Sequence, residues 1–280
     1  MATITRFAPS PTGNLHLGHA FAALTAAAAG SRFLLRLENI DTTRCRPAYE
    51  AAILADLAWL GLVWEEPVLH QSARMEAYAA ALERLKAAGL VYPCFCTRAA
   101  IAEEIARAGD APSGPDGALY PGTCRHLSAA ERAERKAAGV PYALRLDAAK
   151  AAAVVGSLSF DEHGAGPNGQ SGRIAVDPEL FGDVVLARKE TPSAYHLAVV
   201  VDDAFQGVTL VTRGNDLFAA THIQRVLQVL LGLHAPAYAH HRLILDETGK
   251  KFSKRDQAVT LRALRESGVT PDEIRRRIGL

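Results

Sequence analysis

The chain has 280 residues, of which 49% are hydrophobic and 22% are charged, and its formal net charge is +1. These values are typical of a soluble globular protein, and they exclude a largely disordered chain and one that wraps nucleic acid through excess positive charge. The apolar run Phe21 to Gly30 is short and follows no basic segment, so we expect neither a signal peptide nor a membrane span. The expected location is cytoplasmic.

The first part of the chain alternates between strand and helix patterns. Pro47 suits the first turn of a helix, while Gly61 and Gly89 suit positions just after a helix. The predicted elements are a strand at 3–8, a helix at 17–29, a strand at 33–37, helices at 47–60 and 73–88, and a strand at 91–95.

Two segments rich in Gly and Pro, 109–122 and 164–172, interrupt this pattern, and strand and helix patterns then return. The later elements are predicted as strands at 198–201 and 208–212, a helix at 217–231 and a strand at 242–245. The sequence therefore predicts an α/β fold. A Rossmann-type parallel sheet with helices on both faces is split by an insertion and followed by a short C-terminal helical segment. The predicted parts are the first half of the nucleotide-binding domain at 1–93, the insertion at 94–194, the second half at 195–240, and a loop with a helical C-terminus at 241–280.

Two short motifs stand far apart in the chain: His16-Leu17-Gly18-His19 opens a predicted helix, and Lys251-Phe252-Ser253-Lys254-Arg255 lies near the end. A helix N-terminus with two imidazoles favours phosphate, and Gly18 allows close approach of a base or ribose. Taken singly, each motif also fits a surface cluster or a solvated loop.

Together the motifs resemble the HIGH and KMSKS signatures of class I aminoacyl-tRNA synthetases, with Leu17 in place of Ile and with Phe252 and Arg255 altering the second. The resemblance implies ATP binding, with Mg²⁺ accompanying the nucleotide. The residues implied in ATP binding are His16, Gly18, His19 and Lys254, and those implied in catalysis are His16, His19, Lys251 and Lys254.

Charged residues at predicted strand ends indicate an amino-acid pocket. Glu38 follows the strand at 33–37 and could hold an ammonium group, while Arg6 and Arg213 suit carboxylates. This set favours glutamate or aspartate as a ligand. The alternative is that Glu38 pairs with one of the arginines at the sheet edge.

The segments around these residues resemble glutamyl-tRNA synthetases, and the resemblance covers nearly the whole chain. It rests on RFAPSPTG at 6–13, RLENID at 36–41 with Arg44, and RGNDL at 213–217. Asn39 departs from the acidic residue usual in that family. The resemblance implies an L-glutamate pocket lined by Arg6, Ala8, Ser10, Glu38, Tyr195 and Arg213.

Three of the four cysteines have a spacing typical of a metal site: Cys94 and Cys96 flank one residue, and Cys124 follows a long loop. Either Tyr120 or His126 could supply the fourth donor, and the alternative to a metal site is that the cysteines are small buried apolar residues. The pattern Cys-x-Cys followed by Tyr-x-x-x-Cys resembles that of glutamyl-queuosine tRNA(Asp) synthetases. That resemblance implies one structural Zn²⁺ per chain with Cys94, Cys96, Tyr120 and Cys124 as ligands.

Only 25 residues follow Arg255, and 270–273 is a capped helix start, so we expect no anticodon-binding domain of the glutamyl-tRNA synthetase kind. We interpret Arg275 to Arg277 as a solvated helix end, and the alternative is a specific contact with RNA. The resemblance then implies activation of L-glutamate by ATP and its transfer to queuosine in the anticodon stem-loop of tRNA(Asp), by a monomer without membrane contact. The alternatives are a glutamyl-tRNA synthetase charging a tRNA 3′ end, an inactive RNA-binding relative, and an adenylate-forming ligase with a small-molecule acceptor.

Overall fold

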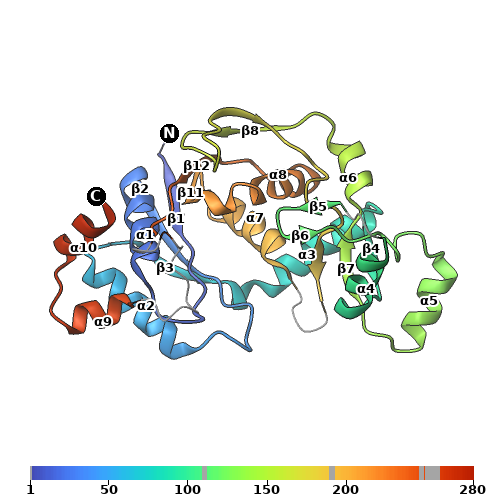
Figure 1. The fold of residues 1–280 in the computed structure, drawn as a ribbon, viewed down its shortest axis with the longest axis horizontal. Helices are drawn as coiled ribbons and strands as arrows, with labels where there is room; N and C mark the ends of the chain where they lie inside the picture. Colours follow the sequence, from blue (N-terminus) through green and yellow to red (C-terminus); the bar gives the residue numbers. More distant parts are fainter. Residues whose placement is uncertain (1, 109–111, 189–192, 246–248, 250–258) are drawn as a thin grey trace.

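The computed structural model describes residues 2–108, 112–188, 193–245, 249 and 259–280, so Lys251 and Lys254 lie outside the described residues. Strands and helices follow one another along this length (Figure 1). The strands are β1 (Ile4–Phe7), β2 (Arg32–Leu37), β3 (Glu65–His70), β4 (Val91–Cys94), β5 (Ser113–Gly114), β6 (Gly117–Ala118), β7 (Ala143–Leu146), β8 (Ser159–Glu162), β9 (Gly172–Ala175), β10 (Val185–Ala187), β11 (Leu210–Gly214) and β12 (Ala237–His241). The α-helices are α1 (Leu17–Ala29), α2 (Pro47–Trp59), α3 (Met75–Ala87), α4 (Arg98–Ala108), α5 (Ala129–Ala137), α6 (Ala148–Val155), α7 (Tyr195–Phe205), α8 (Ala220–Leu230), α9 (Leu261–Glu266) and α10 (Pro271–Ile278), with 3₁₀ turns η1 (Gln71–Arg74) and η2 (Asn215–Leu217).

A parallel sheet forms the centre of the molecule. β1, β2 and β3 pair in parallel, and so do β11, β12 and β8, with β9 antiparallel at the edge. The two groups of strands meet where β1 lies beside β11, because the backbone N–H of Thr209 donates to the carbonyl of Ile4 at 3.0 Å. Helix α1 packs on β1, β2 and β11, and α7 packs on α8. The parallel sheet with packed helices confirms the predicted α/β fold.

A second, antiparallel sheet is formed by β4, β7 and β10. Together with α4, α5 and the small β5–β6 hairpin it lies at the end of the molecule opposite α9 and α10 (Figure 1). All these elements except β4, which begins at Val91, fall in the range predicted as an insertion. β8 and β9 of the same range join the sheet that contains β12. The division of the chain into four parts stays a prediction.

Two predicted strands are wrong. Residues 198–201 belong to helix α7, where Ala198 to Val200 are buried against α3 and α8. A run of four apolar residues fits a buried helix as well as a buried strand, so periodicity alone could not separate them. The strand predicted at 242–245 lies one step earlier, at β12, where Tyr238 and His240 alternate inward with less buried neighbours.

The end of the chain returns to its beginning. Thr270 caps α10 by accepting a hydrogen bond from the backbone N–H of Glu273 at 3.3 Å, as the predicted helix start requires. Ile274 and Ile278 then enter the same hydrophobic core as α1. Just before α9, the backbone N–H of Leu261 donates to the carbonyl of Leu15 at 2.8 Å, so this segment lies against the first turn of α1.

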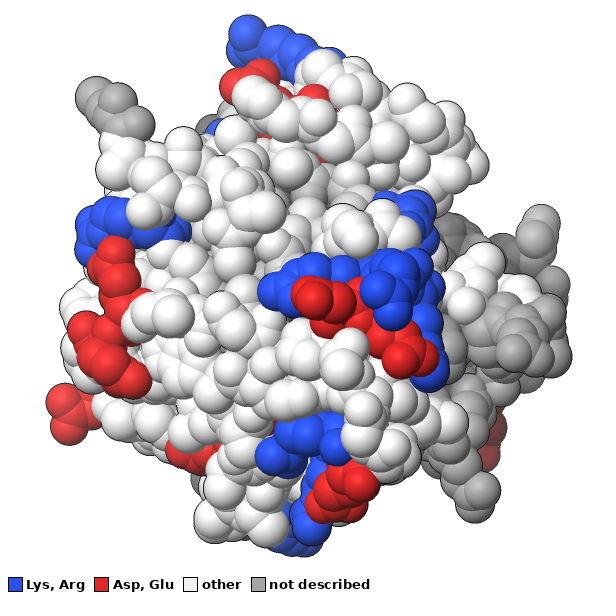
Figure 2. Space-filling view, turned by 90° about the vertical axis from the view of Figure 1, so that its left-hand side faces the viewer, with Lys and Arg blue, Asp and Glu red and all other residues white. Residues whose placement is uncertain are grey.

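The face of the molecule near α9 and α10 carries mixed charge. Arg262 pairs with Glu266 at 2.8 Å, Arg277 pairs with Glu273, and Arg275 donates to the carbonyl of Leu60 at 2.9 Å. Figure 2, which looks onto that side, shows basic and acidic residues interspersed rather than one continuous basic field. This supports the interpretation of the arginine run as a solvated helix end. No helix among the parts that the structure describes is long and apolar enough to cross a membrane.

Candidate active site

The two histidines of the first motif stand at the start of α1. His16 is the N-cap residue, its ring centroid is 3.8 Å from that of His19, and its backbone N–H donates to Nδ1 of His19 at 3.2 Å. A Cβ atom at Gly18 would lie 3.1 Å from Cε1 of His16. Gly18 therefore leaves room for the His16 ring, a role beside the predicted close approach of a ligand.

A cavity of about 250 Å³ opens beside this helix start. Its walls come from α1 on one side and from the end of β11 and the segment after β12 on the other, which brings the two halves of the sheet to one place. Ligands of open α/β sheets bind at such carboxyl ends of strands. The residues that line it include His16, Gly18, His19, Gly214 and Asp216.

Arg6 and Arg36 share one buried carboxylate, that of Asp203. Arg6 donates to both carboxylate oxygens of Asp203 at 3.0 and 3.3 Å, and Arg36 donates to Asp203 Oδ1 at 2.8 Å. All three side chains are buried. Burial alone would raise the pKa of Asp203, but the two guanidiniums hold it at about 2. Arg6, predicted to meet a substrate carboxylate, thus already faces a protein carboxylate.

Glu38 stands at the carboxyl end of β2, as predicted. Its backbone N–H donates to the carbonyl of Pro9 at 3.0 Å, which holds it beside the segment containing Ala8 and Ser10. Its Oε1 lies 3.9 Å from Nε of Arg36. Burial raises the pKa of Glu38 to about 7, against the lowering effect of the nearby guanidiniums. A cation placed here would favour the ionised form.

Arg213 lies in β11 and is 4% exposed, yet its partners are neutral. Nε donates to Nε2 of His240 at 3.0 Å, Nη1 to Oε1 of Gln224 at 2.8 Å, and Nη2 to Oγ1 of Thr221 at 2.7 Å. No acidic side chain within the described ranges forms a salt bridge with Arg213. Its charge is therefore available to an anion, in contrast to the charges of Arg6 and Arg36, which face Asp203.

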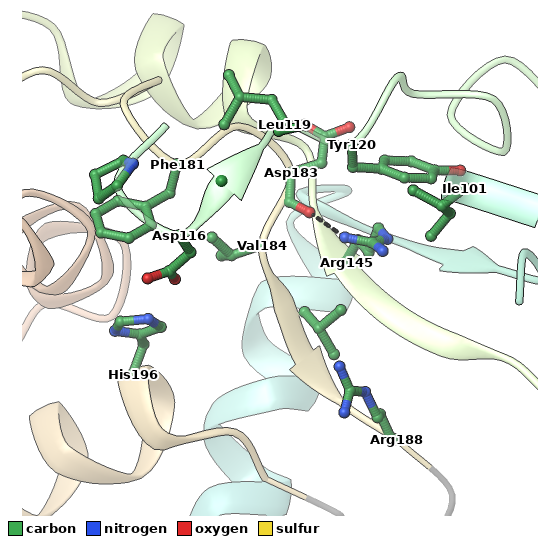
Figure 3. Close-up of a pocket in the computed structure, with 14 residues that line it drawn as sticks. Ile101, Asp116, Leu119, Tyr120, Arg145, Phe181, Asp183, Val184, Arg188 and His196 are labelled. Atoms are coloured by element: carbon green, nitrogen blue, oxygen red, sulfur yellow. Dashed lines mark hydrogen bonds between the residues drawn. The ribbon is translucent and has the colours of Figure 1, made fainter. Parts of the chain in front are cut away.

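Tyr195 and His196 begin α7, and the side chain of Tyr195 is 38% exposed. Burial and the charge of Arg213 lower the pKa of His196 to about 4, so this imidazole is neutral at pH 7. His196 and Phe181, with ring centroids 5.7 Å apart, line one side of a second cavity of about 290 Å³. Figure 3 shows Tyr120, beside Arg145, on the other side of that cavity.

The three predicted cysteine ligands come together. The Sγ atoms of Cys94, Cys96 and Cys124 all lie within 4.8 Å of one another. Oη of Tyr120 is 3.4 Å from Sγ of Cys96 and accepts a hydrogen bond from the backbone N–H of Cys124 at 2.9 Å. His126 is exposed and stands outside this cluster. Three sulfurs and one phenol oxygen are four donors, a set that fits a closed tetrahedral zinc site.

Sequence reasoning missed the acidic pair at the end of α7. Asp202 accepts hydrogen bonds from Gln71 at 2.9 Å, Arg74 at 2.7 Å and Tyr78 at 2.6 Å, while Asp203 binds the two buried arginines described above. The available signal was the pair Asp202 and Asp203 directly after the apolar run 198–201. Two adjacent acidic residues are unusual at the end of an exposed strand. A helix predicted over this run would have indicated that both aspartates lie near the core.

Comparisons with known proteins agree with this geometry. Residues 2–280 match the family model of class I tRNA synthetases (E and Q), catalytic domain, and the chain belongs to this class of enzymes. It is 52% identical over 288 residues to a glutamyl-Q tRNA(Asp) synthetase of Rhodobacter capsulatus, with 99% of this chain and 100% of the relative covered. A glutamyl-Q tRNA(Asp) synthetase of Nocardia farcinica is 49% identical, with 96% of this chain and 81% of the relative covered. The chain belongs to the glutamyl-Q tRNA(Asp) synthetase family, which confirms the resemblance found in the motifs.

Similarity to glutamate–tRNA ligases is more distant and partial. The ligase of Aquifex aeolicus is 38% identical, with 96% of this chain and 55% of the ligase covered. The crystal structure of a glutamate tRNA ligase from Elizabethkingia meningosepticum in complex with its amino acid superposes with a TM-score of 0.72 at 29% identity. This chain spans 52% of that solved chain.

Proposed function

We propose that this protein activates L-glutamate with ATP and transfers it to queuosine in the anticodon of tRNA(Asp). The observation that carries the proposal is the 52% identity to a glutamyl-Q tRNA(Asp) synthetase along the full length of that relative. The charges of the pocket support the amino-acid part. Glu38 suits the ammonium group, and Arg213, which has no acidic partner in the described part of the chain, suits the side-chain carboxylate.

In the first step, an oxygen of the glutamate α-carboxylate attacks the α-phosphorus of ATP, and pyrophosphate leaves. His16 and His19 at the start of α1 meet the phosphates, and Lys254 supplies the main cation for the charge that develops there. Positioning and electrostatic stabilisation dominate such chemistry. Mg²⁺ would accompany ATP and neutralise charge on its phosphates.

In the second step, a hydroxyl of the queuosine cyclopentene ring attacks the carbonyl carbon of glutamyl-adenylate, AMP leaves, and the hydroxyl proton passes to the AMP phosphate. We place the acceptor base in the cavity between His196 and Tyr120, next to Tyr195 at the start of α7. The Phe181 ring there can contact a flat base, while Arg145 and Arg188 line the same cavity (Figure 3).

Cys94, Cys96, Cys124 and Tyr120 would hold a zinc ion. Their four donors leave no open coordination position, so the ion would act structurally by tying the end of β4 to the loop that carries Tyr120. This loop also lines the proposed acceptor cavity. Zinc would thereby fix one wall of the place where the RNA enters.

The test is transfer of radiolabelled L-glutamate to purified tRNA(Asp), with and without queuosine, and to tRNA(Glu) in parallel. Nuclease mapping and mild base then locate the ester. We expect label only in the queuosine-containing anticodon fragment. Label on the 3′ adenosine of tRNA(Glu) would instead favour a glutamyl-tRNA synthetase, the candidate that the 38% identity to the Aquifex ligase supports. No label on either RNA would contradict both.

A further inference from the structure

A buried chain of polar groups stands behind Arg213. Oε2 of Glu162 lies 2.5 Å from Nδ1 of His240, and Nε2 of His240 accepts a hydrogen bond from Nε of Arg213 at 3.0 Å. Glu162 and His240 are each 2% exposed. They come from adjacent parallel strands, β8 and β12, and Arg213 comes from β11 on the other side of β12. Three neighbouring strands thus present one continuous line of side chains.

The bonds at each end fix the tautomer of His240. Arg213 has only donors, so Nε2 of His240 must carry the lone pair and Nδ1 must carry the proton. That proton points to Glu162, whose other oxygen accepts the backbone N–H groups of His240 at 2.7 Å and Gly164 at 2.8 Å. These two backbone N–H groups hold the carboxylate in place. Gly164 can come this close because it lacks a side chain: a Cβ there would stand 2.1 Å from the carbonyl oxygen of His240.

Two donors of Arg213 remain for a ligand. A guanidinium has five N–H groups, and the three partners described above use Nε and one hydrogen on each terminal nitrogen. The two remaining hydrogens, one on each terminal nitrogen, can donate to carboxylate oxygens. Nε2 of Gln224 beside it is buried and makes no hydrogen bond within the described structure, so it offers a further donor.

We propose that Glu162 and His240 are positioning residues that lock the plane of Arg213, and that they thereby set the preference for a side-chain carboxylate over a side-chain amide. The proposal rests on the proposed function, in which Arg213 receives the γ-carboxylate of glutamate. The guanidinium of Arg213 can only donate hydrogen bonds. It meets two acceptor oxygens in the side-chain carboxylate of glutamate, but one acceptor oxygen and one donor NH₂ group in the side-chain amide of glutamine. Rotation of the guanidinium out of this plane would weaken the preference for the carboxylate over the amide. The hydrogen bond to His240 prevents this rotation.

The test compares two histidines of one aromatic cluster. His240 lies 5.2 Å from the Phe218 ring, and His222 lies 6.2 Å from the same ring but accepts only the backbone N–H of Asp177 among the contacts of its ring nitrogens described here. His240→Phe keeps a flat ring and removes the acceptor for Arg213, whereas His222→Phe is the matched control. The readout is pyrophosphate exchange with L-glutamate and with L-glutamine, from which KM and kcat are obtained for each amino acid and for ATP.

We expect His240→Phe to raise the KM for L-glutamate about 10- to 100-fold, the effect of one hydrogen bond to a charged group, and to leave the KM for ATP within about twofold. The ratio of L-glutamate to L-glutamine activation falls with it. His240→Gln, which can return an acceptor oxygen, recovers part of that ratio, and Glu162→Gln lowers it less than His240→Phe does. His222→Phe leaves the ratio unchanged.

An equal loss of kcat in His240→Phe and His222→Phe, with an unchanged glutamate to glutamine ratio, would overturn the positioning role while leaving the proposed function intact. Absence of glutamate-dependent exchange in the wild-type enzyme would instead overturn the proposed function, and the positioning role with it. If His240→Phe does not fold, the ratio measured for Glu162→Gln and His240→Gln decides, because both retain polar partners for their neighbours.

Discussion

Glu38 is the residue whose ionisation bears most directly on substrate binding. Its pKa is raised to about 7 by burial, although two guanidiniums pull it down. The ionised form is the one that can hold an ammonium group. In the folded protein without a ligand, burial therefore disfavours the ionised carboxylate that binds the substrate. The ammonium group of the bound amino acid supplies the positive charge that favours ionisation.

We expect the KM for L-glutamate to be about tenfold higher at pH 6 than at pH 8, because protonated Glu38 predominates below a pKa of about 7. Pyrophosphate exchange at saturating ATP across that range measures it. Glu38→Gln should show a high KM with no such slope. An identical slope in the variant would assign the titration to another group. The sign for folding is opposite, because a raised pKa makes protonated Glu38 favourable, and that contribution is lost as pH rises through 7.

At position 18, helix stability and ATP binding favour different residues. A methyl group here would crowd the His16 ring, at 3.1 Å from Cε1. Gly18→Ala should raise the Tm, since Ala is about 1 kcal/mol better than Gly within a helix. It should also raise the KM for ATP by displacing the ring, while the KM for L-glutamate stays the same. Thermal unfolding and exchange kinetics on one preparation test both effects, and a lower Tm with an unchanged KM for ATP would refute this account.

At the scale of elements, helix α7 connects the pocket to the core. Its first turn carries His196, which lines the second cavity, and its last turns place Asp202 and Asp203 against arginines. The sequence predicted a strand inside this helix, and the acidic pair was missed for the same reason. The helix at α1 was predicted correctly because a polar motif, a long Ala-rich run and Gly30 mark both its ends.

Asp203→Asn should destabilise the protein by roughly 3–5 kcal/mol, because Arg6 and Arg36 would then share no ionised partner in a buried position. Urea unfolding measures the change, with the exposed Asp161→Asn as the control. The pKa of Asp203 is lowered to about 2, so its contribution is present above the ordinary aspartate range and is lost only as pH falls through 2. A loss below about 1 kcal/mol would mean that the arginines find other partners.

At the scale of the whole molecule, the sequence predicted the parallel sheet, the ligand side of that sheet and the group of three cysteines. It did not predict the order of strands around β8, because a single parallel contact between Tyr238 and Glu162 joins β8 to β12 across a long loop. Pairing over such distances leaves no local pattern. The choice between Tyr120 and His126 was likewise open in the sequence, and only the folded loop brings the phenol to the sulfurs.

The protein should contain about one zinc per chain by elemental analysis, and chelation should lower the Tm and expose the segment around α4 to α5 to protease, because metal sites of this kind contribute to folding. Cys94→Ser should abolish the metal and Tyr120→Phe should weaken it by at least about tenfold. Cys45→Ser is the control, since Cys45 lies beside the carbonyl of Glu38 and outside the cysteine cluster. Metal-free protein with an unchanged Tm would contradict a structural zinc.

The contact between Leu15 and Leu261 joins positions almost the whole chain apart. A ribosome delivers the start of α1 long before α9, so the first turn of α1 lacks this contact until late in synthesis. Contacts of such separation slow folding, because the intervening chain must be ordered before they form. A chain that ends before α9 therefore has the first motif but lacks the backbone contact that supports it.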